Sequence, residues 1–264
     1  MRRLLFLGLC CLLGPAAAAP LVVAFDNASM PTQYADAQGA AAGVYPAVVR
    51  RAFALMGEPV TLQSLPFRRI LQGLRAGSLG AGALVATAER ERIGRFSAPY
   101  YREELRLYQR SPPQWQFAGL ASLHGRTVGV IRGWSYGPAF DAARAAGLFQ
   151  TEDVGTDFQN FRKLVIGRVD AVVANALAGG MARALPEFRP ISPAAQVLSQ
   201  TPIHLVLPLR PDTPALLRRF DAAVQRLQAS GELAQIVERE LAQARTAQAA
   251  AEAQGASLAQ LPPR

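Results

Sequence analysis

Short apolar runs alternate with amphipathic segments along most of the chain. Residues 21–25, 60–65 and 81–86 are short apolar runs that read as strands, and the last of these has the small side chains of a buried parallel strand. Between them, apolar residues recur at helical spacing over residues 44–56 and again after Pro66. Strands that alternate with helices predict a sheet with crossover connections.

The same alternation starts again after residue 113. Residues 127–131 and 169–174 read as buried strands, and residues 136–146 and 158–166 read as helices. Two α/β units in one chain of 264 residues predict two lobes.

The last third of the chain is predicted to be helical. Thr213 is expected as the N-cap of a first amphipathic helix, with Pro214 at its first position. A second amphipathic helix follows Gly231. Beyond Arg245 the apolar stripe disappears, so this end of the helix is expected to fray.

The amino terminus has the three parts of a secretory signal. Two arginines precede an apolar run over residues 4–14, and small residues follow to residue 19. We therefore expect a signal peptide over residues 1–19 and an exported, periplasmic protein without membrane insertion after cleavage; a retained anchor is the alternative. Cys10 and Cys11 are the two cysteines of the chain, so disulfides and cysteine-ligated zinc are not expected after cleavage.

The formal charge of +9 raises the question of a nucleic-acid partner. The arginines are scattered, often beside Asp or Glu, rather than packed into a run with aromatic residues between them. This pattern favours a solvated surface over nucleic-acid binding. His124 and His204 lack a second ligand at metal-binding spacing, so neither a metal nor a cofactor is expected.

Several motifs occur in an order that is more specific than these patterns. They are Thr87-Ala88-Glu89-Arg90, Phe96-Ser97-Ala98-Pro99-Tyr100, the segment from Leu123 to Val130 followed by Gly133-Trp134-Ser135, Gly167-Arg168-Val169-Asp170-Ala171, and the segment from Leu227 to Ile236. With these motifs the chain resembles the family 3 solute-binding proteins, which are periplasmic receptors of amino-acid ABC transporters.

The resemblance implies an α/β, two-lobed, periplasmic-binding-protein-like (type II) fold with two hinge strands. Lobe one is expected over residues 20–108 plus 205–264, and lobe two over residues 109–204. A small-molecule ligand would be held between them by hinge closure. The expected partner is an ABC permease, and the receptor is expected to be a monomer.

The resemblance also implies roles for single residues. Arg90 matches the arginine that binds the ligand carboxylate, and a guanidinium suits that planar group; a surface ion pair with Glu89 or Glu91 is the alternative. Ser135 matches the place where lobe two offers backbone N–H groups to the same anion.

At the ammonium pole the chain departs from the family. The aspartate that binds the ammonium group falls on Asn175, which brings no charge. Asp26 matches another acid of the family and is expected to supply that charge alone, or else to cap a turn.

The remaining candidate binding residues are mostly apolar. Positions that usually carry hydroxyl groups fall on Gly82, Ala83 and Val85, while Phe67 adds an aromatic ring near the cleft. Trp134 either stacks on the ligand or packs between the lobes.

The predicted function is capture of a small carboxylate-bearing ligand, an amino acid or a derivative, for an ABC transporter, with no enzymatic step. Two alternatives stay open. The first is a periplasmic sensor domain for a signalling partner. The second is a cleft dehydratase, which would need Glu89, Glu103 or Glu104 as its general acid.

Overall fold

The computed structural model describes residues 21–27 and 29–253. The expected signal peptide, residues 1–19, lies outside the described residues. Within them, nine strands form one sheet in the order β4-β1-β5-β11-β7-β10-β8-β9, with β6 paired to β11. Among the helices described, none combines the length and the apolar character needed to cross a bilayer.

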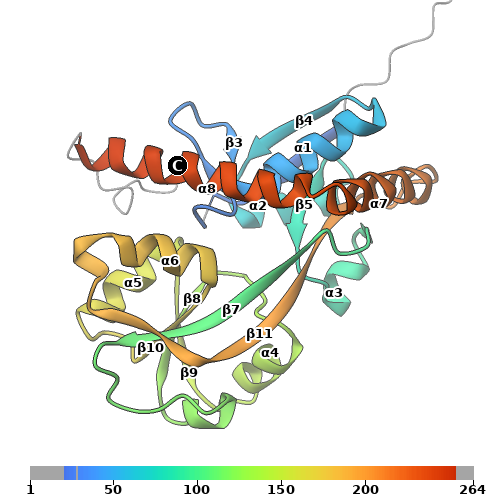
Figure 1. The fold of residues 1–264 in the computed structure, drawn as a ribbon. Helices are drawn as coiled ribbons and strands as arrows, with labels where there is room; N and C mark the ends of the chain where they lie inside the picture. The colour runs from blue at the N-terminus through green and yellow to red at the C-terminus, as the bar shows by residue number, and fades with distance from the viewer. Residues whose placement is uncertain (1–20, 28, 254–264) are drawn as a thin grey trace, which may run out of the picture.

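The first α/β unit is built on three parallel strands (Figure 1). The central strand pairs with both neighbours, and all three match the predicted apolar runs closely. The strands are β1 (Leu21–Phe25), β4 (Val60–Ser64) and β5 (Gly80–Leu84). The helices of this unit are α1 (Val44–Met56), α2 (Phe67–Arg75), the short α3 (Ala88–Glu91) and α7 (Thr213–Ala229).

Helices α1 and α7 bury their apolar faces in one core. Phe53 of α1 and Phe220 of α7 lie with ring centroids 5.9 Å apart, and both are almost completely buried. Thr213 is the first helical residue of α7 rather than its cap, and its hydroxyl donates to the carbonyl of Pro208 at 2.7 Å. The expected cap is therefore displaced by one residue, to Asp212.

The second α/β unit repeats this plan, as predicted. Its parallel strands are β8 (Thr127–Ile131), β9 (Gln150–Val154) and β10 (Ala171–Asn175). Its helices are α4 (Pro138–Ala145), α5 (Asp157–Val165) and α6 (Ala176–Ala184). Shorter elements complete the fold: β2 (Tyr34–Ala35), β3 (Ala41–Ala42), β6 (Arg95–Phe96), and 3-10 turns at Leu120–Leu123 and Pro186–Phe188.

Two long antiparallel strands, β7 (Tyr101–Arg110) and β11 (Ile191–Leu207), join the units (Figure 1). They pair along most of their length, and β11 continues onto β5 while β7 continues onto β10. The pattern of apolar residues did not predict either strand, but the resemblance implied a pair of hinge strands. The two-lobed α/β architecture is confirmed, whereas the lobe boundaries stay a prediction.

Helix α8 (Glu232–Ala253) differs from its prediction. It does not fray after Arg245 but continues to Ala253. Its first turns pack on the core of the first unit through Ile236, and Ala244 is completely buried in the cluster that includes Met30 and Tyr34. The expectation was wrong because burial continues one turn further, at Gln248, without an apolar stripe.

Candidate functional site

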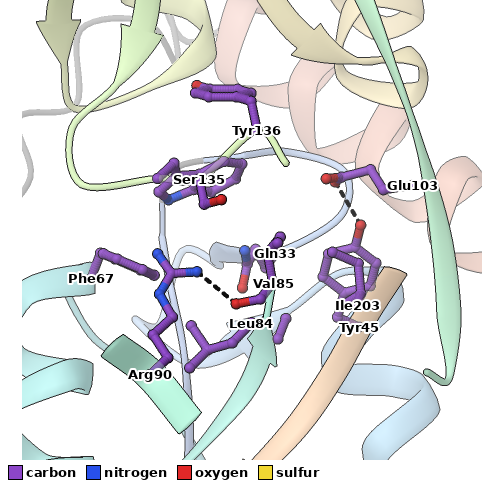
Figure 2. Close-up of a pocket in the computed structure, with 12 residues that line it drawn as sticks. Gln33, Tyr45, Phe67, Leu84, Val85, Arg90, Glu103, Ser135, Tyr136 and Ile203 are labelled. Atoms are coloured by element: carbon purple, nitrogen blue, oxygen red, sulfur yellow. Dashed lines mark hydrogen bonds between the residues drawn. The ribbon is translucent and has the colours of Figure 1, made fainter. Parts of the chain in front are cut away.

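A pocket lies between the two units, and its empty volume is about 400 Å³ when the part open to solvent is included (Figure 2). It forms near the carboxyl ends of the parallel strands, where ligands of open α/β sheets bind. Residues of both units and of the joining strands line it: Gln33, Tyr45, Phe67, Ala83, Leu84, Val85, Arg90, Glu103, Trp134, Ser135, Tyr136 and Ile203.

Arg90 lies at the edge of this pocket and contacts both units. Its guanidinium donates to the carbonyl of Val85 at 2.9 Å and to the carbonyl of Gly133 at 3.1 Å, and Cζ lies 5.2 Å from the ring centroid of Phe67. The residue is 7% exposed, and burial lowers its pKa. In the described part of the chain these bonds use two of the five N–H groups of a guanidinium, so donors remain for an anion.

The local fold of α3 explains how an arginine can be buried here. The hydroxyl of Thr87 accepts the backbone N–H of Arg90 and so begins the helix. The side chain of Arg90 then turns into the pocket, whereas Glu89 is exposed and pairs with Arg75 at 3.4 Å. The alternative of a surface ion pair with Glu89 is therefore not the arrangement found.

Trp134 and Ser135 reach the pocket from the loop before α4. The hydroxyl of Ser135 donates to the carboxylate of Asp141, and the backbone N–H of Tyr136 donates to the same carboxylate at 3.1 Å. Asp141 therefore accepts both the Ser135 hydroxyl and the Tyr136 N–H, while a role of the Ser135 backbone N–H in binding an anion stays a prediction.

Asp26 links the two units but is not among the residues that line the pocket. Its Oδ2 accepts the indole N–H of Trp134 at 2.7 Å, and its Oδ1 accepts the backbone N–H of Asn27 at 2.8 Å. Burial raises its pKa to about 6, although these hydrogen bonds lower it in part. Its carboxylate thus holds Trp134 in place across the boundary between the units.

Asn175 also lies outside the lining residues. Its Oδ1 accepts the backbone N–H of Ala178 at 2.7 Å and caps α6, while its Nδ2 donates to the hydroxyl of Ser29 at 2.9 Å. That hydroxyl donates in turn to Asp157 at 2.6 Å. The amide is therefore engaged in a buried contact between the units.

Phe67, Ala83 and Val85 are among the apolar residues that line the pocket, and their contact with a ligand stays a prediction. Gly82 does not line the pocket, because the ring of Phe25 lies against it: an added Cβ would stand 2.1 Å from that ring. A side chain at this position could not reach the ligand without moving Phe25.

Glu103 of β7 is the charged lining residue that the binding-site prediction missed. Its Oε1 accepts the hydroxyl of Tyr45 at 2.7 Å, and burial raises its pKa to about 7. The segment Tyr101–Arg110 does contain a signal, because Leu105 and Leu107 alternate with more exposed residues and Glu103 shares their inward register. From the sequence, Glu103 was expected only as a candidate general acid.

Among residues 21–27 and 29–253, no three His, Cys, Asp or Glu side chains lie close enough together to hold a metal ion. The pocket therefore offers a buried guanidinium, a buried carboxyl group and an aromatic wall, a set of groups suited to binding a small polar molecule.

Solved structures with the same fold include binding proteins and sensor domains. A histidine kinase sensor domain with similarity to periplasmic binding proteins superposes with a TM-score of 0.72 at 22% identity, covering 84% of this chain and 96% of that one. The amino acid ABC transporter substrate-binding protein AbpA from Streptococcus pneumoniae, bound to L-arginine, gives 0.70 at 20% identity, with 86% and 95% covered. The BvgS VFT2 domain of Bordetella pertussis gives 0.68 at 21% identity, with 83% and 92% covered.

A search of curated proteins finds no match to this sequence. The family model for bacterial extracellular solute-binding proteins, family 3, matches residues 21–243. Together with the two α/β units and the pocket between them, this match shows that the chain belongs to the family 3 bacterial extracellular solute-binding proteins.

Proposed function

We propose that the protein is a periplasmic receptor that captures a small carboxylate-bearing ligand, an amino acid or a derivative, for an ABC permease. The observation that carries this proposal is the buried guanidinium of Arg90 at the edge of the pocket. A carboxylate that leaves water for a closed cleft needs an opposite charge or oriented donors, and a guanidinium supplies both.

Ligand capture would proceed by closure of lobe one (residues 20–108 and 205–264) on lobe two (residues 109–204), with bending in β7 and β11. Two bonds between the units support this mechanism: Arg90 to the carbonyl of Gly133 and Trp134 to Asp26. A ligand that binds Arg90 in the closed form would shift the population toward that form. No covalent step is part of the proposal.

A sensor role is the second candidate. It is supported by the fold shared with the histidine kinase sensor domain and with the BvgS VFT2 domain. The two roles share the ligand site and differ in the protein that reads the closed form. Uptake of radiolabelled ligand by cells with and without this gene distinguishes them, because only the transport role predicts a loss of uptake.

Isothermal titration of the mature protein against amino acids and small organic acids tests the binding site. Arg90→Ala is expected to weaken binding of the ligand identified by roughly tenfold to a hundredfold or more, because the carboxylate loses a charged donor pair. Arg92→Ala is the matched control, since Arg92 is exposed and its side chain donates to the backbone carbonyl of Ala88.

Arg90→Lys separates a binding role from a structural one. It keeps the positive charge and loses the planar fork, so it is expected to bind more weakly than the wild type and better than Arg90→Ala. Circular dichroism confirms that each variant is folded. Undiminished affinity in a folded Arg90→Ala variant would contradict the site assignment.

A further inference from the structure

The pocket has two charged poles, of which the Arg90 guanidinium is only one. Glu103 lines the opposite side, and Figure 2 shows both groups pointing into the pocket. Glu103 is 5% exposed, and among the described residues the hydroxyl of Tyr45 is the hydrogen-bond partner of its carboxyl group. The second oxygen, Oε2, is left for a molecule in the pocket.

Two other acidic groups near the boundary between the units do not line the pocket. Both oxygens of Asp26 accept hydrogen bonds, from Trp134 and Asn27. Oδ2 of Asp157 accepts from Ser29, and its Oδ1 is buried without a hydrogen-bond partner among the described residues, away from the pocket lining. Glu103 is therefore the carboxyl group of this region that both lines the pocket and keeps an oxygen free.

The residues that line the pocket with Glu103 are suited to a cationic group of a ligand. Tyr45, Trp134 and Tyr136 also line the pocket, and Tyr45 contacts Glu103 through its hydroxyl. Aromatic faces attract cations through the quadrupole of the ring, and this attraction is strongest in a site from which water is excluded. A carboxylate in a pocket lined in part by aromatic rings is thus suited to a protonated amine or a guanidinium.

We propose that Glu103 binds the cationic nitrogen group of the ligand, which makes the ligand a zwitterion held between Glu103 and Arg90. This inference rests on the proposed function, because it takes the carboxylate of the same ligand to be at Arg90. It assigns the ammonium pole to the hinge strand β7, in place of Asn175 and Asp26.

The protonation of Glu103 gives the binding step a measurable signature. Burial raises the pKa of its carboxyl group to about 7, so a bound cation would favour the ionised form and release a proton. At pH 7 about half a proton should leave per ligand bound. Thr201 lies opposite Glu103 on β11. The titratable groups near enough for Glu103 to raise their pKa are Tyr45 of α1, Tyr100 just before β7, Tyr101 of β7, Tyr136 before α4 and Asp157 of α5.

The experiment uses two pairs of probes that differ only in the amine, together with two unpaired cationic probes. The wild type, Glu103→Gln and Glu104→Gln are titrated calorimetrically with γ-aminobutyrate and butyrate, with L-alanine and propionate, with L-arginine, and with butylamine as an amine that lacks a carboxylate. Glu104 is the matched control, because it is the next residue of the strand and bonds to Arg106 and Gln200 away from the pocket. Glutamine at position 103 still accepts the hydroxyl of Tyr45, so the fold is expected to survive.

We expect the wild type to prefer the amine-bearing member of at least one pair. Glu103→Gln should weaken that member by roughly tenfold or more and change its partner acid by less than about threefold. Titrations at pH 7 in buffers of different ionisation enthalpy should show proton release that disappears in Glu103→Gln and persists in Glu104→Gln.

Equal weakening of both members of a pair, or none, would overturn the inference, and so would a wild type that binds none of the amine-bearing probes. The Arg90→Ala variant separates this result from a failure of the proposed function. If Arg90→Ala abolishes binding while Glu103→Gln has no effect, the inference fails and the carboxylate site stands. If butylamine binds through Glu103 and no acid depends on Arg90, the proposed function fails and the cation site stands.

Discussion

Replacing Glu103 with glutamine should stabilise the protein without ligand, and only above a certain pH. Glu103 is buried, and its pKa rises from 4.5 to about 7 mainly because burial disfavours the charged form. The hydroxyl of Tyr45 compensates for this cost only in part. Such a destabilising buried carboxyl group is expected if the charge of Glu103 binds a ligand.

The sign and size follow from proton linkage. Between pH 4.5 and about 7 the folded protein binds the Glu103 proton more tightly than the unfolded chain, so the free energy of unfolding of the wild type falls as the pH rises through this window. At about 1.4 kcal/mol per pKa unit the loss is about 3 kcal/mol. Glutamine does not titrate, so the variant should match the wild type near pH 4 and exceed it by about 3 kcal/mol above pH 7.

Urea denaturation at a series of pH values from 4 to 8.5 measures this difference directly. In thermal scans above pH 7 it should appear as a rise in Tm of about 6–12 °C, given the sensitivity expected for a chain of this size. Glu104→Gln serves as the control on the same strand and is expected to follow the pH profile of the wild type. A stability difference between Glu103→Gln and the wild type that does not change with pH would refute the reasoning.

Two further substitution pairs test the packing around the pocket and along α8. Gly82→Ser should lower the free energy of unfolding by about 1–3 kcal/mol in urea denaturation, because its Cβ would meet the ring of Phe25. Ala83→Ser is the control and should lower it by less than about 1 kcal/mol, because residue 83 lines the pocket. Equal losses in the two variants would contradict the placement of Phe25. Ala244→Glu should lower the free energy of unfolding by about 2–4 kcal/mol because it places a charge in the buried cluster that includes Met30 and Tyr34. Ala247→Glu, on the exposed side of the same helix, should change it by less than about 0.5 kcal/mol. Equal stability of the two variants would contradict the burial of this part of α8.

The alternation of strands and helices could be predicted from the sequence because each element carries its own pattern of apolar residues. The predicted strand at residues 21–25 and the helix at residues 44–56 match the structure, and the core clusters are formed largely by those apolar positions. Strand β11 could not be predicted in this way. Its burial alternates irregularly, with register shifts against β7 near Pro193 and Val197, so it lacks the regular alternation by which a strand is recognised.

The candidate site was predicted in part. Arg90 was identified through its motif, and Thr87 begins the short helix that carries it, but its surroundings include Phe67 and the carbonyl of Gly133 in the other unit. The roles expected for Asp26 and Asn175 depended on what each would meet across the boundary between the units. Asp26 meets Trp134, 108 residues away, and Asn175 meets Ser29, 146 residues away.

Local order in the sequence thus determined the class of fold, the family and the arginine of the pocket, because apolar periodicity and short motifs act over a few neighbouring residues. Only the tertiary structure decided which acidic group faces the pocket, which ones are used to join the two units, and how far α8 extends. The physical reason is that the energy of a buried charge depends on the donors, rings and solvent around it. For Glu103 these come from α1, β7 and the loop before α4, which only the folded chain brings together.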